Sequence, residues 1–344
     1  MKINKILIII AVIALAFSVT AVLAGNKDKI GGAGAQELLI PVGSRGIAMG
    51  GSFNAIVSGN EAIYWNPAGL AASPANAEAT FSNLQYLADT QVNYFAISSN
   101  FGSIGSFGVS AKVLDLGEFA ETTEFETEGT GRMVSPSFVV LGFTFSRQMT
   151  DRIFFGVNTK LISESFLRMN ATGVAFDFGV QYISNYGVRM GLTLNNFGGM
   201  MKYSGEDLQT TVEIPFTEAG TDAFDLRWEA QGFELPSTFD IGIAYDYKVS
   251  DEHVVTVTSN YRNQNYGLDE VMGGAEYAFN NMFFVRGGYS MMPEGESEDH
   301  IFGVTAGAGI KYKLAGTTSV MFDYAYRETK WFDANQWFTV GITF

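Results

Sequence analysis

The side chains that could catalyse a reaction are few and widely spaced in this sequence. Cysteine is absent, and the histidines are His253 and His300. A nucleophilic serine needs a base within hydrogen-bonding reach, and a zinc site needs three or four ligands held together. We expect the two histidines at opposite ends of the fold, and neither belongs to a recognisable triad or zinc motif. The sequence therefore favours a protein that is not an enzyme and that uses no metal or cofactor.

Acidic side chains gather in three stretches that we expect to be loops, at 115–128, 206–229 and 294–299. Clustered carboxylates can bind Ca²⁺, but none of the stretches has the ligand spacing of a calcium loop, so a solvated surface is the simpler interpretation. The second stretch also carries Phe216, Phe224 and Trp228. Apolar residues on an exposed loop indicate contact with a partner or ligand, or packing over the mouth of the fold.

The stretch 43–70, GSRGIAMGGSFNAIVSGNEAIYWNPAGL, shows no alternation and is rich in glycine. Glycine allows irregular backbone, and Pro67 after Asn66 predicts a turn. Such a mostly apolar segment needs something to pack inside. We therefore interpret 25–76 as a hatch that lies inside a barrel wall formed by 77–344.

Arg45 is the charged hatch residue with the clearest possible function. We expect it among carboxylates that point inward from the wall, namely Asp177, Asp240, Asp246, Glu276 and Asp323. Ion pairs there could hold a gate closed, or could be a permanent anchor, since an unpaired buried charge is costly.

Period-2 alternation in the rest of the chain predicts the wall. In the last segment Phe338, Val340 and Ile342 share one face, and the other face carries Trp337 and Thr339. The stretches 174–182, 239–247, 302–312 and 320–326 repeat the pattern, with Phe302 on the apolar face of its segment. Lipid on one side of a strand and water on the other demand this alternation, which favours a transmembrane barrel over a soluble β-sandwich.

About 14 such segments follow one another, and each is long enough to cross a bilayer when tilted. We expect strands near 77–87, 91–101, 104–115, 133–147, 152–164, 170–183, 187–203, 235–248, 253–263, 269–279, 282–291, 300–314, 317–327 and 335–344. Connections after even-numbered segments are short, and the long ones follow odd-numbered segments. That is typical of an all-β, antiparallel outer-membrane barrel with its long loops outside.

The first 24 residues have the pattern of a secretory signal peptide, with Lys2 and Lys5, an apolar run and a small-residue site ending at Ala24. Its removal would leave 19 basic and 36 acidic side chains, a net charge of −17. We therefore expect no binding to nucleic acid, which is itself strongly negative.

These features together resemble the FadL-type outer-membrane proteins, and within them the PorV/PorQ-like family. The residues that carry the resemblance are Arg45, Gly46, Met49, Gly50, Gly51, Trp65, Asn66, Pro67, Ala68, Gly69 and Leu70. The resemblance implies a 14-stranded barrel in the bacterial outer membrane, in contact with its lipid, whose hatch or gate includes the first eight of these residues. Phe344 looks like the signal by which the barrel assembly machinery recognises its clients.

Two functions follow from the resemblance. In the first, the barrel passes a hydrophobic small molecule across the outer membrane, and the hatch gates a small apolar pocket. We expect inward residues to line that pocket, namely Phe138, Phe154, Met272, Phe284 and Met321. The alternative is a component of type IX protein secretion that binds secreted or envelope proteins at its outer loops.

Overall fold

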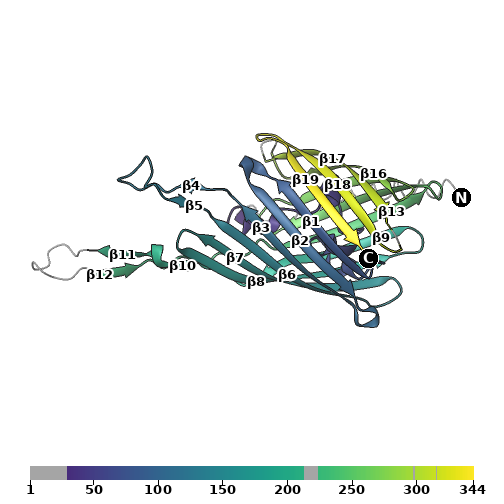
Figure 1. Ribbon diagram of the computed structural model, residues 1–344, viewed down its shortest axis with the longest axis horizontal. Helices are drawn as coiled ribbons and strands as arrows, with labels where there is room; N and C mark the ends of the chain where they lie inside the picture. Colours follow the sequence, from purple (N-terminus) through teal and green to yellow (C-terminus); the bar gives the residue numbers. More distant parts are fainter. Residues whose placement is uncertain (1–28, 213–223, 297–298, 315) are drawn as a thin grey trace, which may run out of the picture.

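The wall is a single sheet that closes on itself, seen from the side in Figure 1. The computed structural model of the chain describes residues 29–212, 224–296, 299–314 and 316–344. Within these residues, fourteen antiparallel strands form the wall: β1 (Ala77–Gln85), β2 (Gln91–Asn100), β3 (Ser106–Asp115), β6 (Ser137–Gln148), β7 (Ile153–Phe166), β8 (Met169–Ile183), β9 (Val188–Gly198), β13 (Thr238–Lys248), β14 (His253–Gln264), β15 (Glu270–Phe279), β16 (Phe283–Met291), β17 (Phe302–Lys313), β18 (Ser319–Thr329) and β19 (Asn335–Thr343). Pairing of β1 with β19 completes the ring. The predicted all-β barrel of about 14 strands is confirmed.

The two faces of the wall differ as the alternation predicts. On β19, Phe338 faces outward and is half exposed, whereas Trp337 is fully buried inside. On β8, Phe176 and Phe178 face outward and Asp177 between them is fully buried. The exterior is thus apolar and the lumen side largely polar, which is the distribution that a barrel in lipid requires.

The two ends of the barrel have different connections. At one end, here called the turn end, strands are joined by short turns such as 149–152 and 249–252. The wall also starts and finishes at this end, where the Phe344 amide donates to the Ala77 carbonyl at 2.9 Å. The opposite end, the loop end, carries the long connections 116–136 and 199–237.

Two hairpins project from the loop end beyond the wall (Figure 1). One contains β4 (Phe119–Ala120) and β5 (Met133–Val134), and the other contains β11 (Gln209–Val212) and β12 (Phe224–Arg227). Strand β10 (Ser204–Gly205) pairs with β8, and short 3-10 helices occur as η6 (Leu87–Asp89), η7 (Gly102–Ile104) and η8 (Glu206–Leu208).

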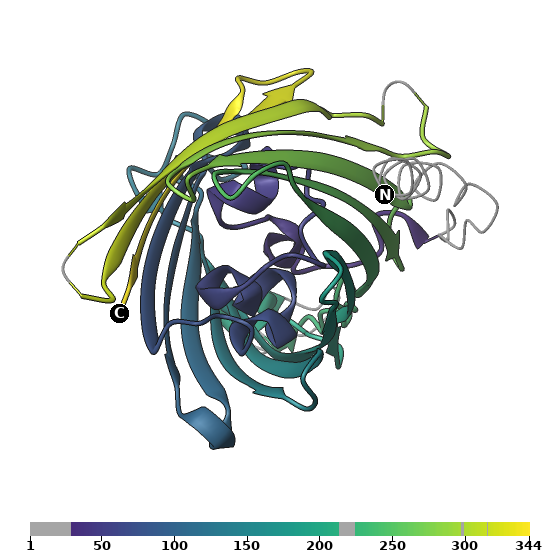
Figure 2. The same ribbon diagram turned by 90° about the vertical axis from the view of Figure 1, so that its right-hand side faces the viewer.

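The segment before the wall lies inside the barrel, as the view along the lumen in Figure 2 shows. It folds into η3 (Gln36–Leu39), α2 (Ser44–Ala48), η4 (Gly59–Glu61), α3 (Ala62–Trp65) and η5 (Pro67–Leu70). We call residues 29–76 the hatch, keeping the predicted name. The described residues contain no helix long and apolar enough to cross a membrane. The predicted signal peptide lies outside the described residues.

Sequence explains why the hatch helices are so short. Gly50 and Gly51 have φ angles of 69° and 82°, which glycine adopts at little cost, and they end the α2 region. Asn66 then caps η5, because its side chain accepts a hydrogen bond from the Ala68 amide and Pro67 occupies the first turn. The Asn-Pro pair therefore forms the turn that the sequence predicts.

Candidate functional site

Glycines on the lumen side of the wall form the seat of the hatch. At eight of them an added Cβ atom would lie within 3.2 Å of a hatch atom: Gly108, Gly156, Gly179, Gly191, Gly242, Gly274, Gly288 and Gly307. Several of the closest approaches are to backbone, for example 2.2 Å to the Gly50 nitrogen at Gly288 and 2.2 Å to the Pro67 carbonyl carbon at Gly156. The hatch backbone thus packs directly against the wall backbone. Glycines at alternate positions of the wall strands are visible in the sequence. They are the signal from which the hatch contacts on the wall could have been predicted.

Wall amides and hydroxyls satisfy the backbone of the irregular hatch. Gln181 on β8 donates to the Asn54 and Val57 carbonyls at 3.2 and 3.0 Å. Ser146 on β6 donates to the Ala68 carbonyl at 2.9 Å. Because buried carbonyls without a partner are costly, these side chains replace the secondary structure that the hatch lacks.

Asn54 and Asn66 form the centre of this polar contact, and both are buried. The Asn66 amide donates to the Asn54 side-chain oxygen at 2.7 Å and to the Val180 carbonyl at 3.3 Å. Asn54 in turn donates to the Gly191 carbonyl at 3.3 Å. Asn66, predicted as a hatch residue from its motif, therefore fastens two hatch turns to β8, and Asn54 fastens them to β9.

Arg45 forms a bidentate ion pair with Glu276 on β15, at 2.8 and 2.9 Å. Arg286 on β16 lies beside it and contacts both Glu276 and Asp323. Its side chain has no exposed surface, so it is a buried cation between two carboxylates. Sequence reasoning missed Arg286, although its inward position follows from the alternation of β16.

The expectation that five wall carboxylates surround Arg45 is wrong for three of them. Asp177 pairs with Lys160 at 2.8 Å, Asp240 with Arg262 at 2.9 Å, and Asp246 with Arg189 at 2.6 Å. Each of these partners is itself a wall residue. These three wall carboxylates are therefore neutralised by cations of the wall, and Arg45 of the hatch joins a separate local network with Glu276, Arg286 and Asp323.

A second hatch anchor lies near the loop end. Lys112 on β3 is buried, and its ammonium donates to the Glu37 and Ile40 carbonyls. Burial, and then the nearby carboxylate of Glu164, raise the pKa of Glu37 to about 7. The Tyr203 hydroxyl donates to the Glu164 carboxylate. This start of the hatch is held by a buried lysine that sequence reasoning did not identify.

The other predicted gate residues lie in the hatch core. Gly46 packs against Trp65 and Phe53, since an added Cβ would lie 2.7 Å from the indole of Trp65. Met49 covers Gly274 and Gly288. Trp65 donates to the Val42 carbonyl at 3.0 Å and meets Phe53 edge to face. These residues are well placed to hold the hatch closed, and their role as a gate stays a prediction.

The five residues predicted to line one apolar pocket are not brought together. Met272 lines a cavity at the loop end, and Phe138 packs at the edge of the hatch core. Phe154, Phe284 and Met321 lie near the turn-end starts of β7, β16 and β18. Alternation placed all five on the lumen side, but the hatch separates the two ends of the lumen.

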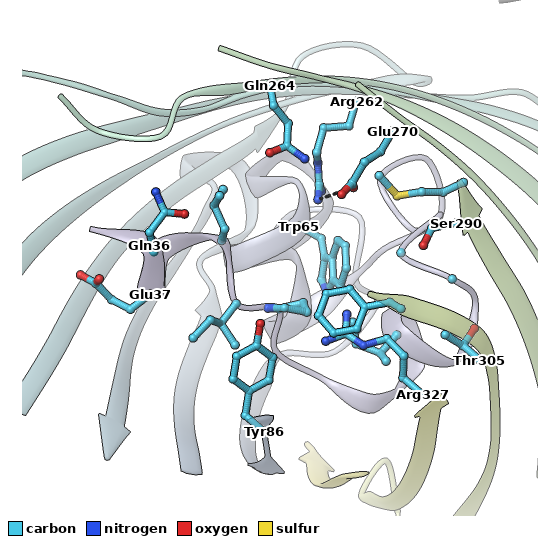
Figure 3. Close-up of a pocket in the computed structure, with 18 of the residues that line it drawn as sticks. Gln36, Glu37, Trp65, Tyr86, Arg262, Gln264, Glu270, Ser290, Thr305 and Arg327 are labelled. Atoms are coloured by element: carbon cyan, nitrogen blue, oxygen red, sulfur yellow. Dashed lines mark ion pairs between the residues drawn. The ribbon is translucent and has the colours of Figure 1, made fainter. Parts of the chain in front are cut away.

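The loop-end cavity has a volume of about 360 Å³ and lies between hatch and wall (Figure 3). The hatch contributes Ile47, Gly51 and Trp65, and the wall contributes Leu114 and Met272 as further apolar lining. The polar lining is larger than predicted and includes Gln36, Glu37, Tyr86, Arg262, Gln264, Glu270, Ser290, Thr305 and Arg327. An ion pair between Arg262 and Glu270, at 3.7 Å, crosses one side of it.

Phe302 also lines this cavity, which corrects its predicted place on the outer face. The pairing of β17 with β18 shifts between Phe302 and Thr305, so that residues 303 and 304 oppose Glu328 alone. This extra residue is a β-bulge, which turns the side chains before it to the other face.

The remaining predicted residues lie outside the cavity. Trp228 is exposed at the projecting hairpin, Phe224 is the first residue of β12 in that hairpin, and Phe216 lies outside the described residues. His253 contacts the Tyr277 hydroxyl at 2.6 Å at the turn end, whereas His300 lies at the loop end. Among the described residues no group of three or more metal-ligating side chains comes together.

Comparison with solved structures shows two channels of similar fold. The CymD monoaromatic hydrocarbon channel is 15% identical with a TM-score of 0.57, over 89% of this chain and 98% of that one. The Pseudomonas putida toluene transporter TodX is 13% identical with a TM-score of 0.54, over 88% of this chain and 97% of that one. No protein-family model matches the sequence, and a search of curated proteins found no match. At these identities the likeness shows the fold alone, and the predicted closeness to the PorV/PorQ-like family stays a prediction.

Proposed function

We propose that this chain is an outer-membrane channel for hydrophobic small molecules and that the hatch is its gate. The observation that carries the proposal is the hatch itself, seated on glycines around a closed barrel and leaving a partly apolar cavity at the loop end. The likeness to channels for toluene and other monoaromatic hydrocarbons supports the class of cargo. Passage of this kind needs no catalytic group.

The geometry of the seat supports gating. The contacts between hatch and wall include hydrogen bonds, the bidentate ion pair of Arg45, backbone packing and a shared apolar cluster, all of which are noncovalent. With many contacts of moderate strength, the closed state can be stable and still differ from an open state by only a few kcal/mol in free energy. A cargo molecule that enters the cavity from the loop end would contact Trp65 and Gly51 of the hatch.

The same proposal includes export of the chain and its assembly in the outer membrane. Residues 1–24 would be removed on export, and the apolar exterior would contact outer-membrane lipid. Phe344 would serve the assembly machinery before β19 closes on β1. Extracellular loops would be those of the loop end.

Uptake by whole cells tests the proposal. The chain is expressed in a Gram-negative host whose own channels for hydrophobic compounds are deleted, and radiolabelled toluene uptake is followed over seconds. We expect faster uptake than in cells with an empty vector, with no gain for a disaccharide of greater polarity. Equal toluene uptake in the two strains would overturn the proposal. Protein partners co-purified through the outer hairpins, in that case, would favour the type IX secretion role.

A further inference from the structure

Arg327 is a buried cation at the loop-end cavity that has no carboxylate in contact. The residue is 8% exposed, and its Nε and Nη2 atoms have no hydrogen-bond acceptor. These two atoms carry three of the five N–H groups of a guanidinium. Tyr86 lines the same cavity. Arg262, by contrast, is paired with both Asp240 and Glu270.

Asn335 lies directly opposite Arg327 in the pairing of β18 with β19. It is fully buried, and neither its amide nitrogen nor its amide oxygen has a partner. Buried polar groups without partners cost free energy, and two such side chains side by side are unusual in a folded protein. Of the two residues Arg327 lines the cavity, so its unpartnered N–H groups are the ones that a ligand could satisfy.

The bulge in β17 gives this place an apolar cover. Because residues 303 and 304 oppose Glu328 alone, Phe302 turns inward and its ring lies 3.5 Å from the Arg327 guanidinium. The centroid of the Trp337 ring lies 4.9 Å from the guanidinium carbon. A guanidinium against aromatic rings is weakly hydrated and keeps its in-plane N–H groups available for an acceptor.

The size and lining of the cavity limit which ligand could carry a polar group to Arg327. A volume of about 360 Å³ lies near the lower end of the roughly 300–1,000 Å³ that is usual for small-molecule sites. Trp65, Leu114 and Met272 offer an apolar surface for a small ring. Glu37 and Glu270 also line the cavity, so a second negative charge on the ligand would be repelled.

We propose that the cavity binds a compact organic acid, with one carboxylate on Arg327 and an apolar ring against Trp65 and Met272. This inference rests on the proposed channel function and narrows its cargo from hydrocarbons in general to small ring-bearing monocarboxylates. A carboxylate presents two acceptors in the plane of the guanidinium fork, which is the pairing that arginine prefers. A hydrocarbon of the same size would leave the N–H groups of Arg327 unpartnered.

Benzoate and toluene are matched probes, because they share a ring and differ by a carboxylate in place of a methyl group. Isothermal titration of the purified full barrel in a non-ionic detergent at pH 7.5 should show benzoate binding at least about tenfold more tightly than toluene. Arg327→Gln should weaken benzoate by about 10- to 100-fold, as expected for a hydrogen bond to a charged group. Toluene affinity should change less than about twofold, because the apolar lining is intact.

Two control variants separate this role from folding and from general charge. Arg327→Lys keeps the charge but loses the planar fork, and should bind benzoate with intermediate affinity. Lys311→Gln removes a cation from β17 outside the cavity and should leave both affinities unchanged. The heat-dependent shift in gel mobility verifies that each barrel is folded.

Equal affinity of the native barrel for benzoate and toluene would overturn the inference, as would benzoate binding that Arg327→Gln leaves unchanged. Tight binding of a long-chain fatty acid but not of benzoate would also overturn it, because the ligand would then not be compact. In each of these cases toluene uptake by cells can still succeed, so the channel proposal is judged separately.

Discussion

Replacing Gly288 by valine is expected to displace the hatch and convert a closed barrel into a leaking one. An added Cβ would lie 2.2 Å from the Gly50 nitrogen, which is backbone and cannot move alone. Overpacking of this kind costs roughly 1–3 kcal/mol. Since about 1.4 kcal/mol changes an equilibrium tenfold, the open fraction should rise by about tenfold or more. Conductance of single barrels in a planar bilayer measures it.

Gly287 is the matched control, because it is the adjacent residue of the same strand. An added Cβ there would meet nothing closer than the Thr305 carbonyl oxygen at 3.8 Å. Gly287→Val makes the same chemical change and should leave conductance at the native level. Equal conductance in the two variants would show that the Gly50 contact does not hold the hatch.

Replacing Arg286 by methionine is expected to be the most destabilising single change among the charged lumen residues. Its side chain is fully buried and contacts both Glu276 and Asp323. Glu276 would keep Arg45, but Asp323 would lose its ion-pair partner. Removing one partner of a buried ion pair costs roughly 3–5 kcal/mol. Thermal unfolding of the purified barrel in detergent, followed by tryptophan fluorescence, should show a clearly lower midpoint.

Arg189→Met provides the comparison. Arg189 pairs with Asp246 at 2.6 Å, but its side chain is 32% exposed. Exposed ion pairs contribute about 0–1 kcal/mol, so this midpoint should fall only slightly. A midpoint as low as that of Arg286→Met would mean that burial does not set the strength of these pairs.

The wall was predictable because each strand faces two different solvents. Phe338 faces lipid and Thr339 faces the polar lumen, and each residue type suits its own surroundings. Local alternation of apolar and polar residues is therefore enough to place both. The Asn66-Pro67 turn was predictable for a similar reason, since the Asn side chain caps its own next turn. Both signals are local in sequence.

The site was not predictable in the same way, because it depends on closure of the ring. Arg286 approaches Arg45 only through Glu276, 231 residues from Arg45 in sequence. The inward turn of Phe302 depends on one extra residue in β17, which alternation alone cannot reveal. The sequence thus showed which wall side chains point inward. It did not show how far along the lumen each one lies or which of them contact the hatch.

Locking the hatch to the wall tests its proposed movement most directly. The Ser44 and Thr339 hydroxyl oxygens lie 2.7 Å apart, one on α2 and one on β19. Cysteines at both positions should therefore form a disulfide, in which the sulfurs lie about 2.05 Å apart. The chain has no cysteine of its own, so the background is clean.

A wall-only lock shares one of these positions and serves as the control. The Ser82 and Thr339 hydroxyl oxygens lie 2.8 Å apart, with Ser82 on β1 and Thr339 on β19. Toluene uptake is measured in cells that carry Ser44→Cys with Thr339→Cys, or Ser82→Cys with Thr339→Cys, before and after reduction. A moving hatch predicts that the first lock blocks uptake until the disulfide is reduced and that the second has no effect. Native uptake through the oxidised hatch lock would contradict the account.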